Sequence, residues 1–96
     1  MGRLTTLFEG IKGQNSGWNV VAEGEREFLT SAFDQGIACC EIKIEALNEK
    51  TLKYSVAVKK GADVRFAQRP HAGVTGEDLA RCLAVARTMG ETMIAE

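Results

Sequence analysis

Three cysteines and one histidine are the side chains of this sequence best suited to metal binding or nucleophilic chemistry: Cys39, Cys40, Cys82 and His71. Four such ligands are enough for a tetrahedral zinc site. However, Cys39 and Cys40 are adjacent, and neighbouring residues of a strand point to opposite sides of a sheet, so the two cannot readily hold one ion. There is also no C-x-x-C pair. We therefore expect no metal site, with Cys40 and Cys82 as small core residues.

Cys39 is the remaining candidate nucleophile. In the strand expected around it, Cys39 lies on the solvent side near Lys59, and a nearby ammonium favours the reactive thiolate. A Cys–His pair with His71 would then be conceivable. The alternative, which we prefer, is a surface or interface cysteine. The sequence shows no Ser–His–Asp set, paired carboxylates or phosphate-binding glycine motif, so we expect no enzyme and no cofactor.

Basic side chains on the expected solvent side of the sheet form the other candidate site. The predicted binding residues are Lys43, Lys53, Ser55, Ala57, Lys59, Arg65 and Arg69. Acidic residues are interspersed among them, which is typical of an ordinary solvated sheet, but the small residues at the centre could accept a partner chain. Without exposed aromatic rings, such a surface is a poor platform for single-stranded RNA.

The bulk composition limits the class of protein. A length of 96 residues suits one domain, 1–96. Twelve Lys+Arg against thirteen Asp+Glu give a net charge of −1, which argues against binding dominated by nucleic-acid phosphates. An odd number of cysteines argues against a secreted protein held together by disulfides. No apolar run approaches the ~20 residues of a membrane span, and no signal peptide is recognisable, so a cytoplasmic protein without membrane contact is predicted.

Three runs of alternating apolar and polar residues, over 40–46, 52–58 and 63–69, predict antiparallel strands with one wet side. The expected register places Glu45 opposite Lys53, and Lys59 opposite Asp63, which sets opposite charges against each other. It also places every apolar residue of the three strands, including Val64 and Phe66, on the buried side.

The flanking segments complete the prediction. Apolar residues at i, i+3, i+4 and i+7 from Leu4 to Ile11 predict a short helix that ends at Gly13. A strand begins at Trp18, and residues 25–33 fit a strand or a helix, with a strand favoured. Thr75 and Asp78 resemble a capping box before a final helix, in which Gly90 would allow close approach to the sheet. The fold class is α+β: an antiparallel meander of three to five strands, covered on one side by the C-terminal helix and the short N-terminal helix.

This order of elements resembles the type III secretion chaperone-like fold. The local similarity is mainly Gly73-Val74-Thr75-Gly76-Glu77-Asp78-Leu79, a capped entry into the last helix, with the segment from Leu4 to Ile11 as the opening helix and Trp18 at the first strand. The resemblance implies a small dimer that binds another protein. The double-stranded RNA-binding domain is similar in topology. Its lysine cluster is replaced here by Thr75-Gly76-Glu77-Asp78, which would repel phosphate, so it ranks lower.

The function expected from these observations is a non-enzymatic protein-interaction domain, acting as a small chaperone, adaptor or inhibitor and favouring a homodimer. A phage- or bacterium-encoded inhibitor of a host protein complex fits the size equally well. The alternative class is an RNA- or DNA-binding module that uses the basic residues of the sheet. A thiol-dependent enzyme based on Cys39 ranks third.

Overall fold

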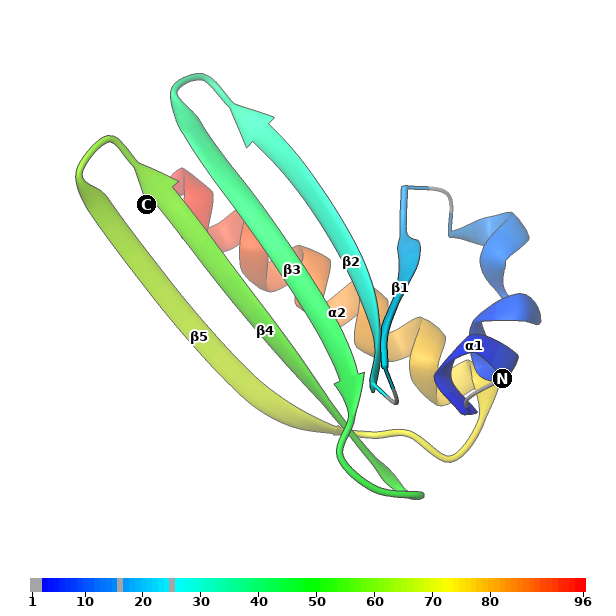
Figure 1. The fold of residues 1–96 in the computed structure, drawn as a ribbon. Coiled ribbons are helices and arrows are strands. Elements are labelled where there is room, and N and C mark those ends of the chain that lie inside the picture. The colour runs from blue at the N-terminus through cyan, green and yellow to red at the C-terminus, as the bar shows by residue number, and fades with distance from the viewer. Residues whose placement is uncertain (1–2, 16, 25) are drawn as a thin grey trace.

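A five-stranded antiparallel sheet and a long C-terminal helix dominate the computed structural model (Figure 1), which describes residues 3–15, 17–24 and 26–96. The elements are α1 (Arg3–Glu9), the 3₁₀ turn η1 (Lys12–Gln14), β1 (Asn19–Glu23), β2 (Arg26–Gln35), β3 (Ala38–Ala46), β4 (Thr51–Lys60), β5 (Asp63–Ala72) and α2 (Gly76–Ala95). The strand order is β1-β2-β3-β4-β5, so every strand pairs with its neighbour in the chain. The predicted α+β meander is confirmed. Residues 26–33 belong to a strand rather than a helix, and residue 25 lies outside the described residues.

Tight turns set the register of the sheet. The β4–β5 loop has two residues, because Lys60 lies opposite Asp63, and Gly61 at its first position has φ +58°. A glycine at positive φ in this position is the pattern of a type II′ turn, whose twist matches that of the flanking strands. The expected pairing of Lys59 with Asp63 is therefore wrong by one residue. The expected pairing of Glu45 with Lys53 is confirmed.

The one-residue difference reverses the two sides of β5. Arg65 lies opposite Val58 and Phe66 lies opposite Ala57. Because the side-chain period of a strand is two, a shift of one residue moves every side chain to the other side of the sheet. Val64 and Phe66, which were predicted to be buried, are therefore on the side away from α2 and are 63% and 62% exposed.

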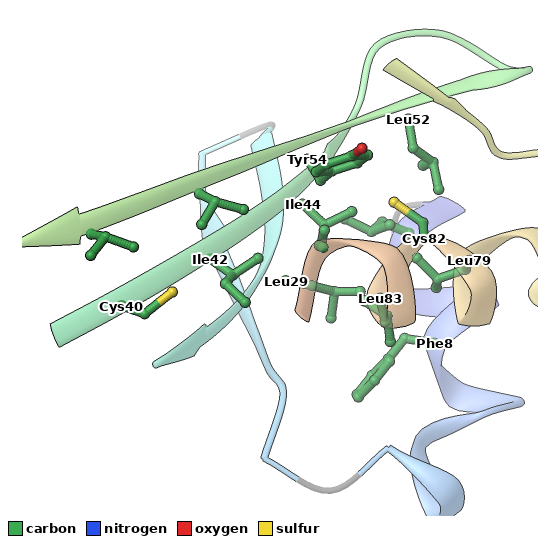
Figure 2. Close-up of a cluster of buried hydrophobic side chains, with 14 of the residues drawn as sticks. Phe8, Leu29, Cys40, Ile42, Ile44, Leu52, Tyr54, Leu79, Cys82 and Leu83 are labelled. Atoms are coloured by element: carbon green, nitrogen blue, oxygen red, sulfur yellow. The ribbon is translucent and has the colours of Figure 1, made fainter. Parts of the chain in front are cut away.

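Helix α2 covers the other side of the sheet and closes the core (Figure 2). Ile42, Ile44 and Val56 from the sheet pack with Leu79 and Leu83 from the helix, and all are almost completely buried. Full burial of such side chains contributes about 1.5–3 kcal/mol each to folding.

Gly90 lies where α2 packs tightly against β3. A Cβ atom built on Gly90 would lie 2.7 Å from the Sγ atom of Cys40. Since real Cβ atoms do not approach other atoms so closely, only glycine fits here without movement of its neighbours. The predicted role of Gly90 is confirmed, and so is the placement of Cys40 and Cys82 in the core.

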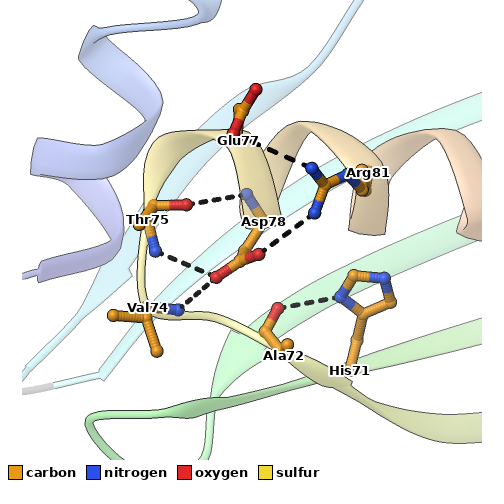
Figure 3. Close-up of polar contacts among 7 residues, drawn as sticks. All are labelled: His71, Ala72, Val74, Thr75, Glu77, Asp78 and Arg81. Carbon is orange, nitrogen blue, oxygen red and sulfur yellow. Dashed lines mark hydrogen bonds and ion pairs between the residues drawn. The ribbon is translucent and has the colours of Figure 1, made fainter.

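A capping box fixes the start of α2 (Figure 3). The backbone N–H of Asp78 donates to Thr75 Oγ1 at 3.2 Å, and Asp78 Oδ2 accepts from the backbone N–H groups of Val74 and Thr75 at 2.9 and 3.2 Å. These contacts satisfy donors that a helix start leaves free.

At the other end of the chain, α1 ends at Glu9 rather than at Gly13, which lies in the 3₁₀ turn.

Candidate functional site

The side of the sheet turned away from α2, here called the open face, holds most of the predicted binding residues. Lys43, Lys53, Ser55, Ala57 and Lys59 all lie on it, because their strand neighbours Ile42, Ile44, Val56 and Val58 are buried on the other side. No described helix packs on this side, since α1 contacts β2 and α2 contacts β3, β4 and β5 from the covered side. The open face therefore leaves these predicted binding residues without cover from a described helix.

A groove of about 500 Å³ crosses the open face and is lined by residues from all five strands. Small side chains, among them Ala32 and Ala57, occupy its middle strands. The aromatic rings of Phe28 and Phe66 line it on β2 and β5, and Val21 lines it on β1. The groove exists because small residues in the centre of the sheet leave a depression between two larger apolar side chains.

Two cations of the open face lie over the ring of Phe28. The Nζ atom of Lys43 lies 3.9 Å from the centre of the Phe28 ring, and the guanidinium of Arg26 lies 5.2 Å from the same centre. Both contacts are cation–π interactions. They explain how Phe28 can be only 4% exposed on a side of the sheet that no helix covers.

Glu45 pairs with two cations of the open face. Its carboxylate lies 2.7 Å from Lys53 Nζ and 3.1 Å from Arg26 Nη2. The hydrogen bond from Lys53 is the main cause that lowers the pKa of Glu45, and partial burial opposes it. Lys53 is therefore already paired within the open face and is not a free cation.

Positive and negative side chains are balanced on the open face. By register, its described charged residues are Arg26, Lys43, Lys53, Lys59, Glu23, Asp34, Glu41 and Glu45. Four cations thus face four carboxylates. Such a surface has no excess positive field to attract a phosphate backbone.

Arg65 and Arg69 do not belong to this surface, which corrects the prediction. Both lie on the α2 side of β5, because the two-residue turn at Gly61 sets the register. Arg65 Nη1 forms an ion pair of 2.7 Å with Glu96 Oε2 at the end of α2, and Arg69 Nη1 donates to the carbonyl of Gln68 at 2.9 Å. Ala67, which pairs with the buried Val56, is also on the α2 side.

Cys39 is exposed on the open face opposite Lys59, as predicted, but its surroundings do not favour the thiolate. A hydrogen bond with Asp34 and the negative charge of that carboxylate raise the pKa of Cys39, and the opposing effect of Lys59 is smaller. These surroundings do not favour the alternative of an activated thiolate, and the exposure of Cys39 agrees with the surface cysteine that we preferred. The sequence missed Asp34 because it lies on another strand, directly opposite Cys39.

His71 lies far from Cys39. It pairs with Leu52 at one end of β4, whereas Cys39 pairs with Lys59 at the other end, roughly 24 Å away at 3.4 Å per residue. The two side chains also lie on opposite sides of the sheet. His71 Nδ1 is 2.8 Å from the carbonyl oxygen of Ala72 (Figure 3). The structure therefore does not bring Cys39 and His71 together.

No cluster of three or more His, Cys, Asp or Glu residues in the described part of the chain could hold a metal ion. No helix among residues 3–15, 17–24 and 26–96 is both long and apolar enough to cross a bilayer.

Comparison with protein-family models, with curated proteins and with solved structures finds no match to this chain. Phe66 is the residue of the candidate site that was not expected on the open face. The signal that would have revealed it is Lys60-Gly61-Ala62-Asp63, in which glycine occupies the first position of a two-residue loop.

Proposed function

We propose that this chain is a non-enzymatic protein-interaction domain that binds a segment of another protein in the groove of the open face. The observation that supports the proposal most is the exposed ring of Phe66 beside small residues in an uncovered groove. Aromatic anchors are enriched at protein interfaces, and hot spots concentrate where such residues fill pockets. The balanced charges around the groove suit a protein partner better than a polyanion.

The chemistry of the groove defines the partner that would fit. An apolar side chain would lie on Ala57 beside the ring of Phe66, and charged or polar groups beside it would meet Glu41 and Lys43. An extended segment of a second protein satisfies these requirements. A cytoplasmic chaperone, an adaptor, and a phage- or bacterium-encoded inhibitor of a host protein complex would all act through such a contact.

A nucleic-acid-binding role is the second candidate, and one observation favours it. Phe66 supplies an exposed aromatic ring on the open face, where none was predicted. Phe66 pairs with Ala57, and Lys59 lies two residues beyond Ala57 on the same side of β4. Stacking on a ring next to a cation is typical of single-strand binding. The four carboxylates of the same face oppose this role, so we rank it below protein binding.

The test is affinity purification of the tagged protein from its native cell extract, at low and at moderate salt. The wild type is compared with Ala57→Glu, which fills the groove with a charged side chain, and with Thr88→Glu, an exposed position on α2. We expect a stoichiometric protein partner with the wild type and with Thr88→Glu, and at least a tenfold loss with Ala57→Glu, since truncating or blocking a central contact costs about 2 kcal/mol or more.

Mass spectrometry and absorbance at 260 nm distinguish the outcomes. A partner that Ala57→Glu retains as well as the wild type would exclude the groove as its binding site. Nucleic acid that elutes as the salt concentration rises, without a protein, would support the second candidate instead.

A further inference from the structure

Strand β5 is a long free edge of the sheet. It spans ten residues and pairs only with β4, whereas the other edge strand, β1, spans five. All described residues of β5 are exposed except Ala67 and His71, which are half-buried. Proteins usually shorten or cover such an edge, because its unpaired backbone groups can add a further strand.

The turn at Gly61 determines which backbone groups of β5 are free. A tight turn makes Lys60 and Asp63 a hydrogen-bonded pair. Because hydrogen-bonded and non-hydrogen-bonded pairs alternate along an antiparallel ladder, the N–H and C=O groups of Val64, Phe66 and Gln68 point away from β4. Pro70 occupies the next outward position, where its missing N–H costs no bond to β4.

We propose that β5 pairs antiparallel with β5 of a second copy of this chain, about a two-fold axis at Phe66. In this register Phe66 lies opposite Phe66 of the second copy, and Val64 lies opposite Gln68. Every outward N–H and C=O group of these three residues then has a backbone partner across the axis. The ladder ends where Pro70 has no N–H to donate.

Charge complementarity selects this register. It places Asp63 of each copy opposite Arg69 of the other, in a non-hydrogen-bonded pair, where side chains are closest. Within the described residues neither side chain has an ion-pair partner of its own chain, since Arg69 donates only to a carbonyl. The interface would thus supply the missing partner for both.

The other symmetric registers are less favourable. An axis at Arg65 would set Arg65 against itself, and an axis at Ala67 would set Arg65 against Arg69, which places like charges opposite each other. With the axis at Val64, only the residues of β5 nearest the turn could pair with the second copy, so the ladder would be shorter. An axis at Gln68 would place Phe66 opposite Pro70, which cannot donate a hydrogen bond.

The first test measures mass in solution. By sedimentation equilibrium we expect the wild type to approach twice the 10.4 kDa of one chain at micromolar concentrations. Asp63→Arg and Arg69→Asp should each weaken the dimer at least tenfold, because each removes both symmetry-related charge pairs and sets like charges opposite each other, and the double variant should restore it. Glu91→Arg, on the exposed side of α2, is the matched charge control and should dimerise like the wild type.

The second test identifies which residues face each other across the interface, and it does not rely on the strength of the dimer. In a Cys39→Ser background, Phe66→Cys places two thiols across the axis at a Cα separation of about 5.5 Å, which a disulfide can bridge. Val64→Cys is the control, because its two copies would lie roughly 13 Å apart along the ladder. Oxidation should therefore cross-link Phe66→Cys and not Val64→Cys.

Either of two results overturns the proposal: a wild-type protein that stays monomeric up to ~100 µM, or equal cross-linking at positions 64 and 66. The proposal is independent of the partner-binding function, since a dimer would be observed with purified protein alone.

Discussion

At the scale of single residues, Cys39 shows how one cross-strand neighbour decides the reactivity of a thiol. Asp34 raises the pKa of Cys39, so a smaller fraction of the thiol ionises at neutral pH. We expect Asp34→Asn to lower that pKa and to speed alkylation by iodoacetamide at pH 8 several-fold, because the thiolate is the reacting species.

The pH profile of the alkylation rate measures this effect. Cys40 and Cys82 should not interfere, since burial raises the pKa of both thiols, that of Cys82 to about 12. Thr88→Ala, remote from the open face, serves as the control. An unchanged rate in Asp34→Asn would show that Asp34 does not govern the thiol.

Asp78 should make the stability of the protein depend on acid. Hydrogen bonds from the backbone N–H groups of Val74 and Thr75 lower the pKa of Asp78 below its ordinary value of 3.8. The stabilisation is therefore complete above about pH 4 and is lost as the pH falls through the lowered folded-state pKa, because protonation removes the charge that accepts these bonds.

Thermal unfolding of Asp78→Asn between pH 7 and pH 2 checks this prediction. The variant should unfold at a lower temperature than the wild type at pH 7, and the difference should shrink at the acid end. Glu77→Gln is the control, because the Glu77 carboxylate contacts Arg81 at 3.7 Å rather than the backbone. A constant difference across the whole range would contradict the assignment.

At the scale of elements, the contact of α2 with β3 depends on the absence of a side chain at position 90. Gly90→Ala would improve helix propensity by ~1 kcal/mol, but its Cβ would meet Cys40 Sγ at 2.7 Å, and overpacking costs about 1–3 kcal/mol. We therefore expect a net loss of unfolding free energy in urea titrations. In a Cys40→Ala background the same substitution should become neutral or stabilising.

A double-mutant cycle separates these effects. Thr88→Ala, an exposed position on α2, gives the effect of helix propensity alone. If Gly90→Ala destabilises equally with and without the Cys40 sulfur, the close contact is not its cause.

The strands also show where the sequence predicts correctly which side chains are buried. Alternation located β3 and β4 correctly, because both lie under α2, where one side chain in two must be apolar. The same rule failed for β5. At the edge of the sheet the covered side can hold Arg65, whose guanidinium reaches Glu96, and the open side can hold Phe66. There the turn chemistry of Gly61 decides the register, not hydrophobicity.

At the scale of the whole molecule, the groove is formed by several strands together, so no single segment of the sequence predicts it. Its lining runs from Val21 to Phe66 and across all five strands. The lysines and small residues of β3 and β4 were predictable from their period alone. The rings that border them were not, because Phe28 depends on cover from Lys43 of another strand, and Phe66 depends on a turn five residues away.

The order of the elements has a consequence for synthesis of the chain. All five strands precede α2, and each strand pairs with its neighbour, so the sheet can form hairpin by hairpin as it leaves the ribosome. The helix of 20 residues follows roughly one to four seconds later at ordinary rates of translation. During that interval Ile42 and Val56 lack their cover, so aggregation of the nascent chain is most probable just before α2 emerges.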